Sequence, residues 1–396
     1  MRNPRTAVAA SLAALFAGAG AAAFTAGGTA KAATTYAVAP YVDLSANSAD
    51  MLDKAIAQGG VTSYTAAFVI GAGCTPIWGD TLGIDNSTVN PRIARAEAAG
   101  ARTIISFGGA GGIELGQSCT DQTALTAAYQ SVISKYKVDH IDFDIEGAAI
   151  ADPVSVDRRF KAIKALEAAN PGLNVSVTIP VLESGPVDSG KTFLANAAAN
   201  GVRLDIVNAM VMDYGHPVAD MAAAAKTAAA GTLSAARGAG LSVTYANIGL
   251  TPMIGNNDSA GEVVTQANAQ DIVSWARANG IGRLAFWSVG RDQPCAGGGV
   301  SPNCSGLGGA ALDFTKIFTG GAGGGGTTPP TTAPTTAPTT APTTTPPGTG
   351  TTWVAGHWYA VGDTVTYDGV GYRCLQAHTS QVGWEPPIVP ALWQRI

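Results

Sequence analysis

An acidic segment in the middle of the chain, DHIDFDIE at residues 139–146, alternates acidic and apolar side chains. Successive side chains on a β-strand point to opposite faces, so Asp142, Asp144 and Glu146 would share one face. The apolar side chains between them would share the other face: Ile141, Phe143 and Ile145. This pattern predicts a buried strand whose apolar face packs on neighbouring elements while its acids point toward a common site.

Three carboxylates on one face would be spaced by about 6.6 Å per step along the strand. They cannot all ionise readily in a partly desolvated site, so we expect at least one proton to be retained or shared. Glu146 is the outermost, and repulsion from its neighbours would raise its pKa toward the range of a general acid. The alternatives are a metal site or a solvated edge strand. The consistent apolar face argues against an edge, and no histidine cluster accompanies the acids; we expect neither a metal nor a cofactor.

The elements around this segment alternate between β-rich and helical patterns. Helical stretches carry apolar residues at helix spacing, for example 125–136, 156–169, 221–236 and 267–279. The predicted strands cover residues 36–44, 64–71, 103–109, 140–146, 174–181, 206–214, 243–250 and 284–290. Strands separated by helices in this way predict an α/β domain of the (β/α)8 TIM-barrel class, which typically has roughly 250 residues. A doubly wound open sheet is the alternative, but no glycine-rich phosphate loop follows the first strand.

Several motifs resemble glycoside hydrolase family 18. DHIDFDIE fits the DxxDxDxE signature of that family, and Ser106-Phe107-Gly108-Gly109 is similar to its SxGG strand, one strand earlier. Trp287, in the segment LAFWSVG, resembles the tryptophan that forms the floor of the sugar site. The resemblance covers essentially all of residues 36–318 and implies a barrel whose site lies at the carboxyl ends of the strands.

The resemblance also implies a reaction. Glu146 would protonate the leaving glycosidic oxygen, and the N-acetyl carbonyl of the substrate would attack the anomeric carbon to give an oxazolinium ion. Asp144 would orient the acetamido group, and Asp142 would share its charge and proton. Family 18 is thus an exception to the scheme in which a second carboxylate is the nucleophile. The residues by themselves would equally allow Asp144 to be a covalent nucleophile.

One motif departs from the common family pattern. Many members have Met-x-Tyr-Asp on the sixth strand, whereas this chain has MVMDY at residues 210–214, with Met212 at the tyrosine position. The resemblance implies that Met210, Asp213 and Tyr214 contact the substrate. The alternative for Tyr214 is an aromatic side chain that only packs at the end of a strand. A related bacterial subgroup, similar to chitinase D, has the same pattern.

The connection between the seventh and eighth predicted strands is short. It comprises residues 251–283, including a predicted helix, and leaves no room for the extra α+β domain of family members with deep, tunnel-like clefts. The resemblance therefore implies an open groove and endo-type cleavage.

The N-terminal residues 1–32 predict a signal peptide. Two arginines precede an apolar stretch at residues 7–24, and small residues follow at residues 30–32, which places the cleavage near Ala32. A retained membrane anchor is the alternative, although a stretch made mostly of alanine and glycine partitions weakly into lipid. We expect a secreted, extracellular protein with no contact to the membrane after cleavage.

The five cysteines fit an oxidising compartment. Cys295 and Cys304 bracket a glycine-rich loop and would form a local disulfide, and Cys74 and Cys119 are the next natural pair, leaving Cys374. Five buried thiols are the alternative.

The composition changes abruptly after residue 318. Residues 319–352 are rich in glycine and then in threonine and proline, and such a segment cannot bury a core, which predicts a linker. Residues 353–396 form a second unit that is similar to the chitin-binding modules of carbohydrate-binding family 5/12. In this short module we expect Trp358, Tyr359 and Trp393 to form the core. Trp384 lies in a Gly- and Pro-containing turn and is the predicted exposed platform for stacking on chitin.

These observations favour an endo-acting chitinase whose partners are chitin and N-acetylglucosamine oligosaccharides. An endo-β-N-acetylglucosaminidase acting on glycoproteins is an alternative, and the terminal module argues against it. A non-catalytic chitin lectin is another, although it would be expected to lack Glu146. The net charge of −5 and the absence of a Lys/Arg run exclude nucleic acid as a partner. A monomer is the expected oligomeric state.

Overall fold

The computed structural model describes two folded parts of the chain. The larger comprises residues 36–79, 81–295 and 299–320; the smaller comprises residues 351–355, 357–360, 362–375, 378–380, 384–387, 389 and 392–396. The predicted signal peptide and residues 321–350 of the predicted linker lie outside the described residues. None of the described helices is both long and apolar enough to cross a bilayer.

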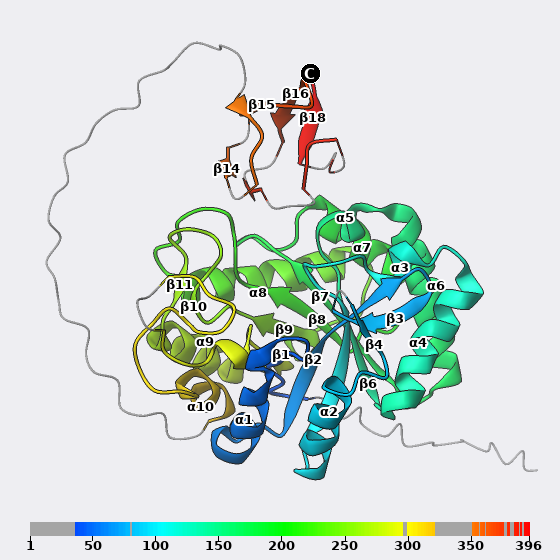
Figure 1. Ribbon diagram of the computed structural model, residues 1–396, viewed down its shortest axis with the longest axis vertical. Helices are drawn as coiled ribbons and strands as arrows, with labels where there is room; N and C mark the ends of the chain where they lie inside the picture. Colours follow the sequence, from blue (N-terminus) through cyan, green and yellow to red (C-terminus); the bar gives the residue numbers. More distant parts are fainter. Residues whose placement is uncertain are drawn as a thin grey trace, which may run out of the picture. The chain divides into compact units, whose positions relative to one another are not determined.

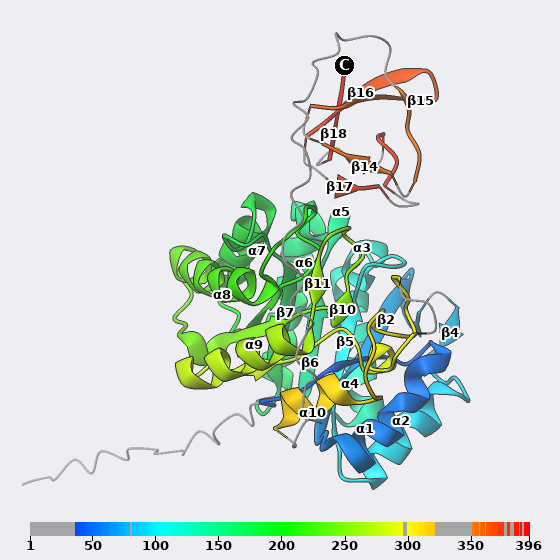
Figure 2. The ribbon, with the colours of Figure 1, turned by 90° about the vertical axis from the view of Figure 1, so that its left-hand side faces the viewer.

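Within the larger part, eight parallel strands form a ring (Figures 1 and 2). They follow the order of the sequence around the ring: β1 (Tyr41–Asp43), β2 (Ser63–Ala72), β5 (Arg102–Gly108), β6 (His140–Asp144), β7 (Asn174–Pro180), β8 (Ile206–Met210), β9 (Ile248–Thr251) and β12 (Arg283–Leu284). The predicted TIM-barrel class is confirmed.

The ring closes between the first and the last strand. The amide nitrogen of Ala39 donates to the carbonyl of Leu284 at 2.9 Å, and that of Tyr41 donates to the carbonyl of Phe286 at 3.1 Å. Because every strand of the ring then has a neighbour on both sides, the ring itself has no open edge.

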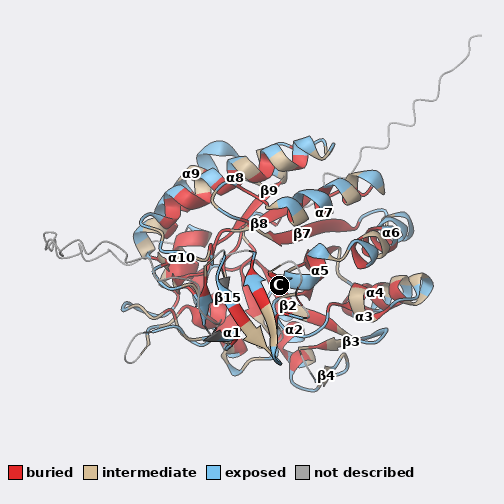
Figure 3. Cartoon of the chain, turned by 90° about the horizontal axis from the view of Figure 1, so that it is seen from above, coloured by how far each residue is buried: buried red, intermediate tan, exposed pale blue. Residues whose placement is uncertain are grey.

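Helices surround the ring and place their exposed faces outward (Figure 3). Aspartates begin several of them, as helix N-caps should: the Asp121 carboxylate accepts from the amide of Ala124, and Asp152 caps a helix that starts with Pro153. The helices are α1 (Met51–Gly59), α2 (Val89–Ala98), α3 (Leu115–Ser118), α4 (Gln122–Tyr136), α5 (Gly147–Ala151), α6 (Pro153–Ala169), α7 (Asp188–Ala199), α8 (Met221–Gly238), α9 (Gln266–Asn279) and α10 (Asp313–Thr319). Short 3₁₀ turns occur at Asn47–Asp50, Tyr245–Asn247 and Val289–Arg291.

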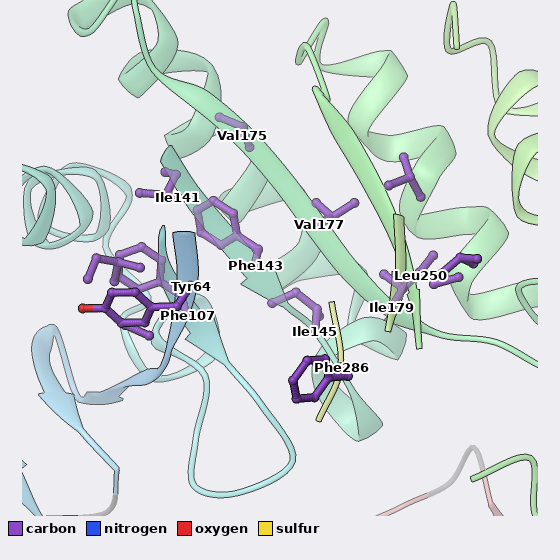
Figure 4. Packing of buried hydrophobic residues seen from close by; sticks show 14 of the residues in the cluster. Tyr64, Phe107, Ile141, Phe143, Ile145, Val175, Val177, Ile179, Leu250 and Phe286 are labelled. Atoms are coloured by element: carbon purple, nitrogen blue, oxygen red, sulfur yellow. The ribbon is translucent and has the colours of Figure 1, made fainter. Parts of the chain in front are cut away.

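The main hydrophobic core lies between the strands and these helices (Figure 4). Phe143 on β6 stacks on Phe107 of β5 at a ring separation of 5.3 Å, and both rings contact Tyr129 of α4. Ile141 and Ile145, on the same face of the segment as Phe143, are also fully buried in this core. The apolar face of DHIDFDIE therefore packs outward against helices, as predicted, and its acidic face is left for the barrel interior.

Smaller elements extend the barrel at its rim. β3 (Thr75–Trp78) and β4 (Leu82–Gly83) continue antiparallel from the end of β2, and β10 (Gly255–Asn256) pairs with β11 (Val263–Val264). Both predicted disulfides are present. Cys74–Cys119 joins the β2–β3 turn to the end of α3, and Cys295–Cys304 closes a loop after β12. Cys374 belongs to neither of these disulfides and is buried.

Several predicted strands are longer than the observed ones. The predicted strand 206–214 ends at Met210, and it could not extend to residue 214 because Asp213 adopts a φ of 49° in the left-handed region. The predicted strand 243–250 begins only at Ile248, because Thr244 and Asn247 form a capping box around a 3₁₀ turn. The two ends of the predicted linker 319–352 lie in secondary structure: Thr319 is the last residue of α10, and Thr351–Thr352 form a strand.

The smaller part is an all-β module with its own core. A sheet of β13 (Thr351–Thr352), β15 (Thr364–Tyr367), β16 (Val370–Cys374) and β18 (Trp393–Arg395) accompanies a pair formed by β14 (Trp358–Tyr359) and β17 (His378–Thr379). The described core residues are Trp353, Tyr359, Val365, Tyr372, Cys374, Val389 and Trp393.

The prediction that Trp358 belongs to the core of this module is wrong. Trp358 is 48% exposed, whereas Tyr359 and Trp393 are each 2% exposed. The reason is the strand itself: Trp358 and Tyr359 are neighbours on β14, so their side chains leave opposite faces and only one of them can enter the core.

Candidate active site

The acidic face of β6 points into the barrel. Asp142 and Asp144 are almost fully buried, at 1% and 4% exposed, and Glu146 follows at the start of α5 with a partly exposed side chain. The three carboxyl groups, called the acid column below, therefore rise from the interior toward the carboxyl end of the strands. This is the end at which barrel enzymes carry their sites.

Four hydroxyl groups from three strands surround Asp142 at the lower end of the acid column. Ser106 on β5 donates to Oδ2 at 2.8 Å, and Tyr41 on β1 donates to the same oxygen at 3.0 Å. Ser176 and Thr178 on β7 both donate to Oδ1. Residues from strands far apart in the sequence thus hold this carboxylate in one orientation.

Asp144 and Glu146 form a hydrogen-bonded carboxyl pair. Burial and, next, the negative charge of Glu146 raise the pKa of Asp144 well above its usual value. Burial raises the pKa of Glu146 to about 7, against the opposing effect of the hydrogen bond from Asp144. The pair therefore keeps at least one proton at neutral pH, as expected for three acids on one face.

Two glycines of the segment SFGG allow neighbouring elements to approach closely. Gly108 has a φ of 104°, and a Cβ there would lie 2.0 Å from the carbonyl oxygen of Asp144. Gly109, with a φ of 87°, faces the ring of Phe68, and its amide donates to the same carbonyl of Asp144 at 2.9 Å. Any larger side chain at Gly108 would displace the strand that carries the acids.

Aromatic rings lie beside the acid column. Trp287, just after β12, is partly exposed and stacks on Phe68 with a ring separation of 5.6 Å and an interplanar angle of 14°. Both rings contact the ring of Tyr41, whose hydroxyl binds Asp142. The peptide bonds Ala67–Phe68 and Trp287–Ser288 are cis. The predicted sugar-floor tryptophan is thus joined to the acids through one intervening aromatic residue.

The predicted substrate residues after β8 lie in different surroundings. Met210 ends β8 with a half-buried side chain, Met212 is buried, and Asp213 is exposed in the loop that follows. The Asp213 carboxylate accepts from the amide of Ser259 at 2.8 Å. Its charge acts on Glu146, which places Asp213 near the upper end of the acid column.

Tyr214 turns away from solvent and is 4% exposed. Its hydroxyl is buried and has no hydrogen-bond partner among the described residues. Burial, and then the charge of Glu262, raise its pKa above the usual value. Glu262 is itself buried, and one of its carboxylate oxygens accepts from the amide of Gly215 at 3.0 Å. Burial raises the pKa of Glu262 to about 7.

Sequence reasoning missed several side chains of this site: Tyr41, Phe68, Ser176, Thr178 and Glu262. A polar side chain within an apolar strand was the available signal for Ser176 and Thr178, because such a side chain must face the barrel interior. Tyr41, Phe68 and Glu262 join the site only through the closure of the ring and the loop after β9, which no local pattern reveals.

In the module, Trp384 is partly buried and packs against the core residues. Its predicted role as a stacking platform stays a prediction. Trp358, which was predicted to be buried, is more exposed than Trp384.

Comparisons with known proteins match both parts of the chain. Residues 352–394 match Carbohydrate-binding module family 5/12. The probable bifunctional chitinase/lysozyme of Escherichia coli (strain K12) is 32% identical over 297 residues, which are 70% of this chain and 33% of that protein. Endochitinase 11 of Metarhizium anisopliae is 31% identical over 283 residues, covering 67% of this chain and 54% of that protein. The chain thus spans about a third and about half of the lengths of these two relatives.

This chain covers a larger share of a solved chitinase structure than of these two relatives. The catalytic domain of the hyperthermophilic chitinase from Pyrococcus furiosus is 31% identical, with a TM-score of 0.66, and the alignment covers 72% of this chain and 94% of that domain. Together with the barrel, the acid column and the matched terminal module, this shows that the chain belongs to the family 18 chitinases and carries a carbohydrate-binding module of family 5/12.

Proposed function

We propose that this chain is a secreted, endo-acting chitinase that hydrolyses β-1,4 linkages of N-acetylglucosamine polymers with retention of the anomeric configuration. The single observation that carries the proposal is the acid column itself: Asp142, Asp144 and Glu146 rise from the barrel interior to the carboxyl end of the strands, where Glu146 begins α5. A partly exposed carboxylic acid with a pKa of about 7 is suited to be a general acid.

The reaction would proceed in two steps. In the first, Glu146 gives its proton to the glycosidic oxygen, the bond from that oxygen to the anomeric carbon breaks, and the N-acetyl carbonyl oxygen of the same sugar bonds to the anomeric carbon. Asp144, with Asp142 beneath it, holds the acetamido nitrogen and balances the charge of the oxazolinium ion. In the second step, the Glu146 carboxylate takes a proton from water as the water oxygen replaces the acetamido oxygen. Family 18 enzymes depart in this way from the scheme with a carboxylate nucleophile.

The rim of the barrel supports binding within a polymer chain. Residues 252–282, between β9 and β12, contain only the β10–β11 pair and α9, so no additional domain covers this side. Ile113 after β5 and Leu182 after β7 expose 57% and 40% of their side chains at the same end of the barrel. Apolar side chains there suit the apolar faces of sugar rings. We assign substrate contacts to Met210, Asp213, Tyr214 and Trp287, and we propose endo-type cleavage because residues 252–282 add no domain over this side.

Two other functions fit less well. An endo-β-N-acetylglucosaminidase would act on glycoproteins, and a terminal module that resembles chitin-binding modules would not serve it. A non-catalytic lectin would not need Glu146 or its raised pKa. We further propose that residues 1–32 direct export, that a linker separates the barrel from the module, and that the protein works as a monomer.

The decisive experiment compares the wild-type protein with Glu146→Gln on soluble N-acetylglucosamine oligosaccharides. The amide preserves the shape of the side chain but cannot donate the proton, so we expect hydrolysis to fall by roughly 100-fold or more with an unchanged circular dichroism spectrum. Glu97→Gln on α2 is the matched control for the loss of one carboxylate and should stay fully active. Comparable turnover by Glu146→Gln would refute the assignment.

Proton NMR of the fresh hydrolysate then tests the mechanism. Participation of the acetamido group requires that the first product is the β-anomer, and oligosaccharides without an N-acetyl group at the scissile sugar should not be cut there. An initial α-anomer would exclude the mechanism.

A further inference from the structure

An arginine is buried inside the barrel beneath the acid column. Arg283, the first residue of β12, is 2% exposed. Its guanidinium donates to Ser176 Oγ of β7 at 2.9 Å and to His140 Nε2 of β6 at 2.8 Å, and its Nε approaches the carbonyl of Tyr36 at 3.4 Å. Hydrogen bonds to three separate segments of the chain fix the guanidinium across the barrel interior.

None of these three acceptors is a carboxylate. A buried guanidinium nevertheless remains charged, and burying a charge without a counter-charge carries a large free-energy penalty. Ser176 connects Arg283 to a counter-charge, because its hydroxyl accepts a hydrogen bond from Arg283 and donates one to Asp142 Oδ1. Burial lowers the pKa of Arg283. Among the nearby charges that oppose this effect and favour the charged guanidinium, that of Asp142 has the largest influence.

His140 takes part as a neutral acceptor. Burial, and then the charge of Arg283, lower the pKa of His140 well below its usual value. Since Nε2 accepts from Arg283, the ring proton belongs on Nδ1. His140 therefore orients the guanidinium without adding a second positive charge.

The other titratable or charged groups around Arg283 are neutral or paired. Burial raises the pKa of Tyr36 and that of Tyr41 above their usual values, so both phenols are neutral at physiological pH. The remaining charges form ion pairs with each other, Arg102 with Asp139 at 2.7 Å and Arg203 with Asp205 at 3.1 Å. Of the three carboxylates near Arg283, Asp139 and Asp205 each contact an arginine directly, whereas Asp142 contacts none among the described residues. The other two acids of the acid column, Asp144 and Glu146, lie farther toward the carboxyl end of the strands.

We propose that Arg283 is a positioning residue for the reaction: through Ser176 it fixes the orientation of the Asp142 side chain, and its positive charge beneath the acid column sets where the proton shared by Asp144 and Glu146 resides. This inference rests on the proposed function and adds to it the group that sets where the proton resides.

The test measures kcat and KM from pH 4 to 9 on a soluble N-acetylglucosamine oligosaccharide. Arg283→Met removes a positive charge close to the acids, so both limbs of the pH profile of kcat/KM should move to higher pH, by about 0.5 to 1 unit. At pH 6, kcat should fall at least about fivefold while KM changes less than twofold, because the substrate contacts are untouched. Arg277→Met on α9 is the matched control, since it removes an exposed arginine, and it should leave the profile unchanged.

A second variant, Ser176→Ala, keeps the positive charge of Arg283 but removes the hydroxyl that connects Arg283 to Asp142. Ser176→Ala should lower kcat several-fold and move the limbs in the same direction by a smaller amount, even if Arg283→Met fails to fold. Folded Arg283→Met or Ser176→Ala protein with the kcat and the pH limbs of the wild type would overturn the proposal. Failure of the wild-type protein to hydrolyse the oligosaccharide would instead refute the proposed function, so the two failures are distinguishable.

Discussion

At the scale of single residues, Glu146 connects activity with pH. Only its protonated form can donate to the glycosidic oxygen, and burial raises its pKa to about 7. Activity should therefore be high at mildly acidic pH and decrease as the pH rises through about 7. A pH–rate profile of kcat/KM on soluble oligosaccharides checks this. An alkaline limb below pH 5 would show that another group is the acid.

The same raised pKa makes Glu146 a destabilising residue at neutral pH. A carboxyl group whose pKa is raised by folding favours the folded state below its unfolded value, about 4.5 for Glu146, and this advantage is lost as the pH rises through about 7. Glu146→Gln cannot ionise, so its free energy of unfolding relative to the wild type should increase between pH 4.5 and pH 7. The full shift corresponds to about 3 kcal/mol at most, and solvent screening at this partly exposed side chain reduces it.

Urea unfolding of the two proteins at pH 4.5 and pH 8 measures this difference. Only the change with pH in the difference between the two free energies of unfolding is diagnostic, because the amide also alters the interaction with Asp144 at every pH. Glu97→Gln again serves as the control and should show no such trend. A difference between Glu146→Gln and the wild type that is the same at both pH values would contradict the prediction.

At the scale of elements, the contact between β5 and β6 depends on Gly108. A Cβ at this position would lie 2.0 Å from the Asp144 carbonyl oxygen, and the φ of 104° is unfavourable for any other residue. Gly108→Ala should therefore lower the free energy of unfolding by about 3 kcal/mol or more, and it should lower kcat by displacing Asp144.

Gly111→Ala in the same loop is the matched control. A Cβ there meets no atom within 4 Å, and the residue is not in the left-handed region, so stability should change by less than about 1 kcal/mol. Thermal unfolding followed by circular dichroism compares the two variants. Equal melting temperatures would show that β5 tolerates a side chain at Gly108.

The elements also show how far the sequence could lead. Alternation at residues 139–146 predicted both the buried apolar face and the inward acids, because a period of two is a local property of a strand. Arg283 shows the limit: its neighbours His140 and Ser176 lie more than a hundred residues earlier in the chain. Nothing near Arg283 in the sequence indicates that a buried charge faces the acid column. Trp358 was assigned wrongly because hydrophobicity alone does not specify which of two adjacent strand residues enters the core.

At the scale of the whole molecule, the module should matter only on a solid substrate. Removal of residues 327–396 should leave hydrolysis of soluble oligosaccharides unchanged and reduce hydrolysis of crystalline chitin, because a tethered module raises the local concentration of the barrel at the surface. Equal activity of the full and the shortened chain on crystalline chitin would refute this role.

Within the module, Trp384→Ala should weaken adsorption to chitin beads by roughly tenfold, which corresponds to about 1.4 kcal/mol of lost stacking. Since Trp384 packs against the module core, a thermal melt must accompany the adsorption measurement. Trp358→Ala is the informative comparison, because that indole is 48% exposed and its removal should not unfold the module. Normal adsorption of a folded Trp384→Ala variant would exclude Trp384 from the binding surface.

The closure of the ring has a consequence for how the protein is made. The segments of β1 and β12 that hydrogen-bond to each other lie at opposite ends of the barrel sequence. β1 is the first barrel strand to be synthesised, so it cannot make these hydrogen bonds until β12, the last strand, has been synthesised. Until then β1 presents an unpaired edge, the kind of surface on which chains pair wrongly. Contacts this distant in sequence form slowly. The interval between the synthesis of β1 and that of β12 is therefore the period in which the nascent chain most needs protection from aggregation, and shortening the chain before β12 would leave it permanently in that state.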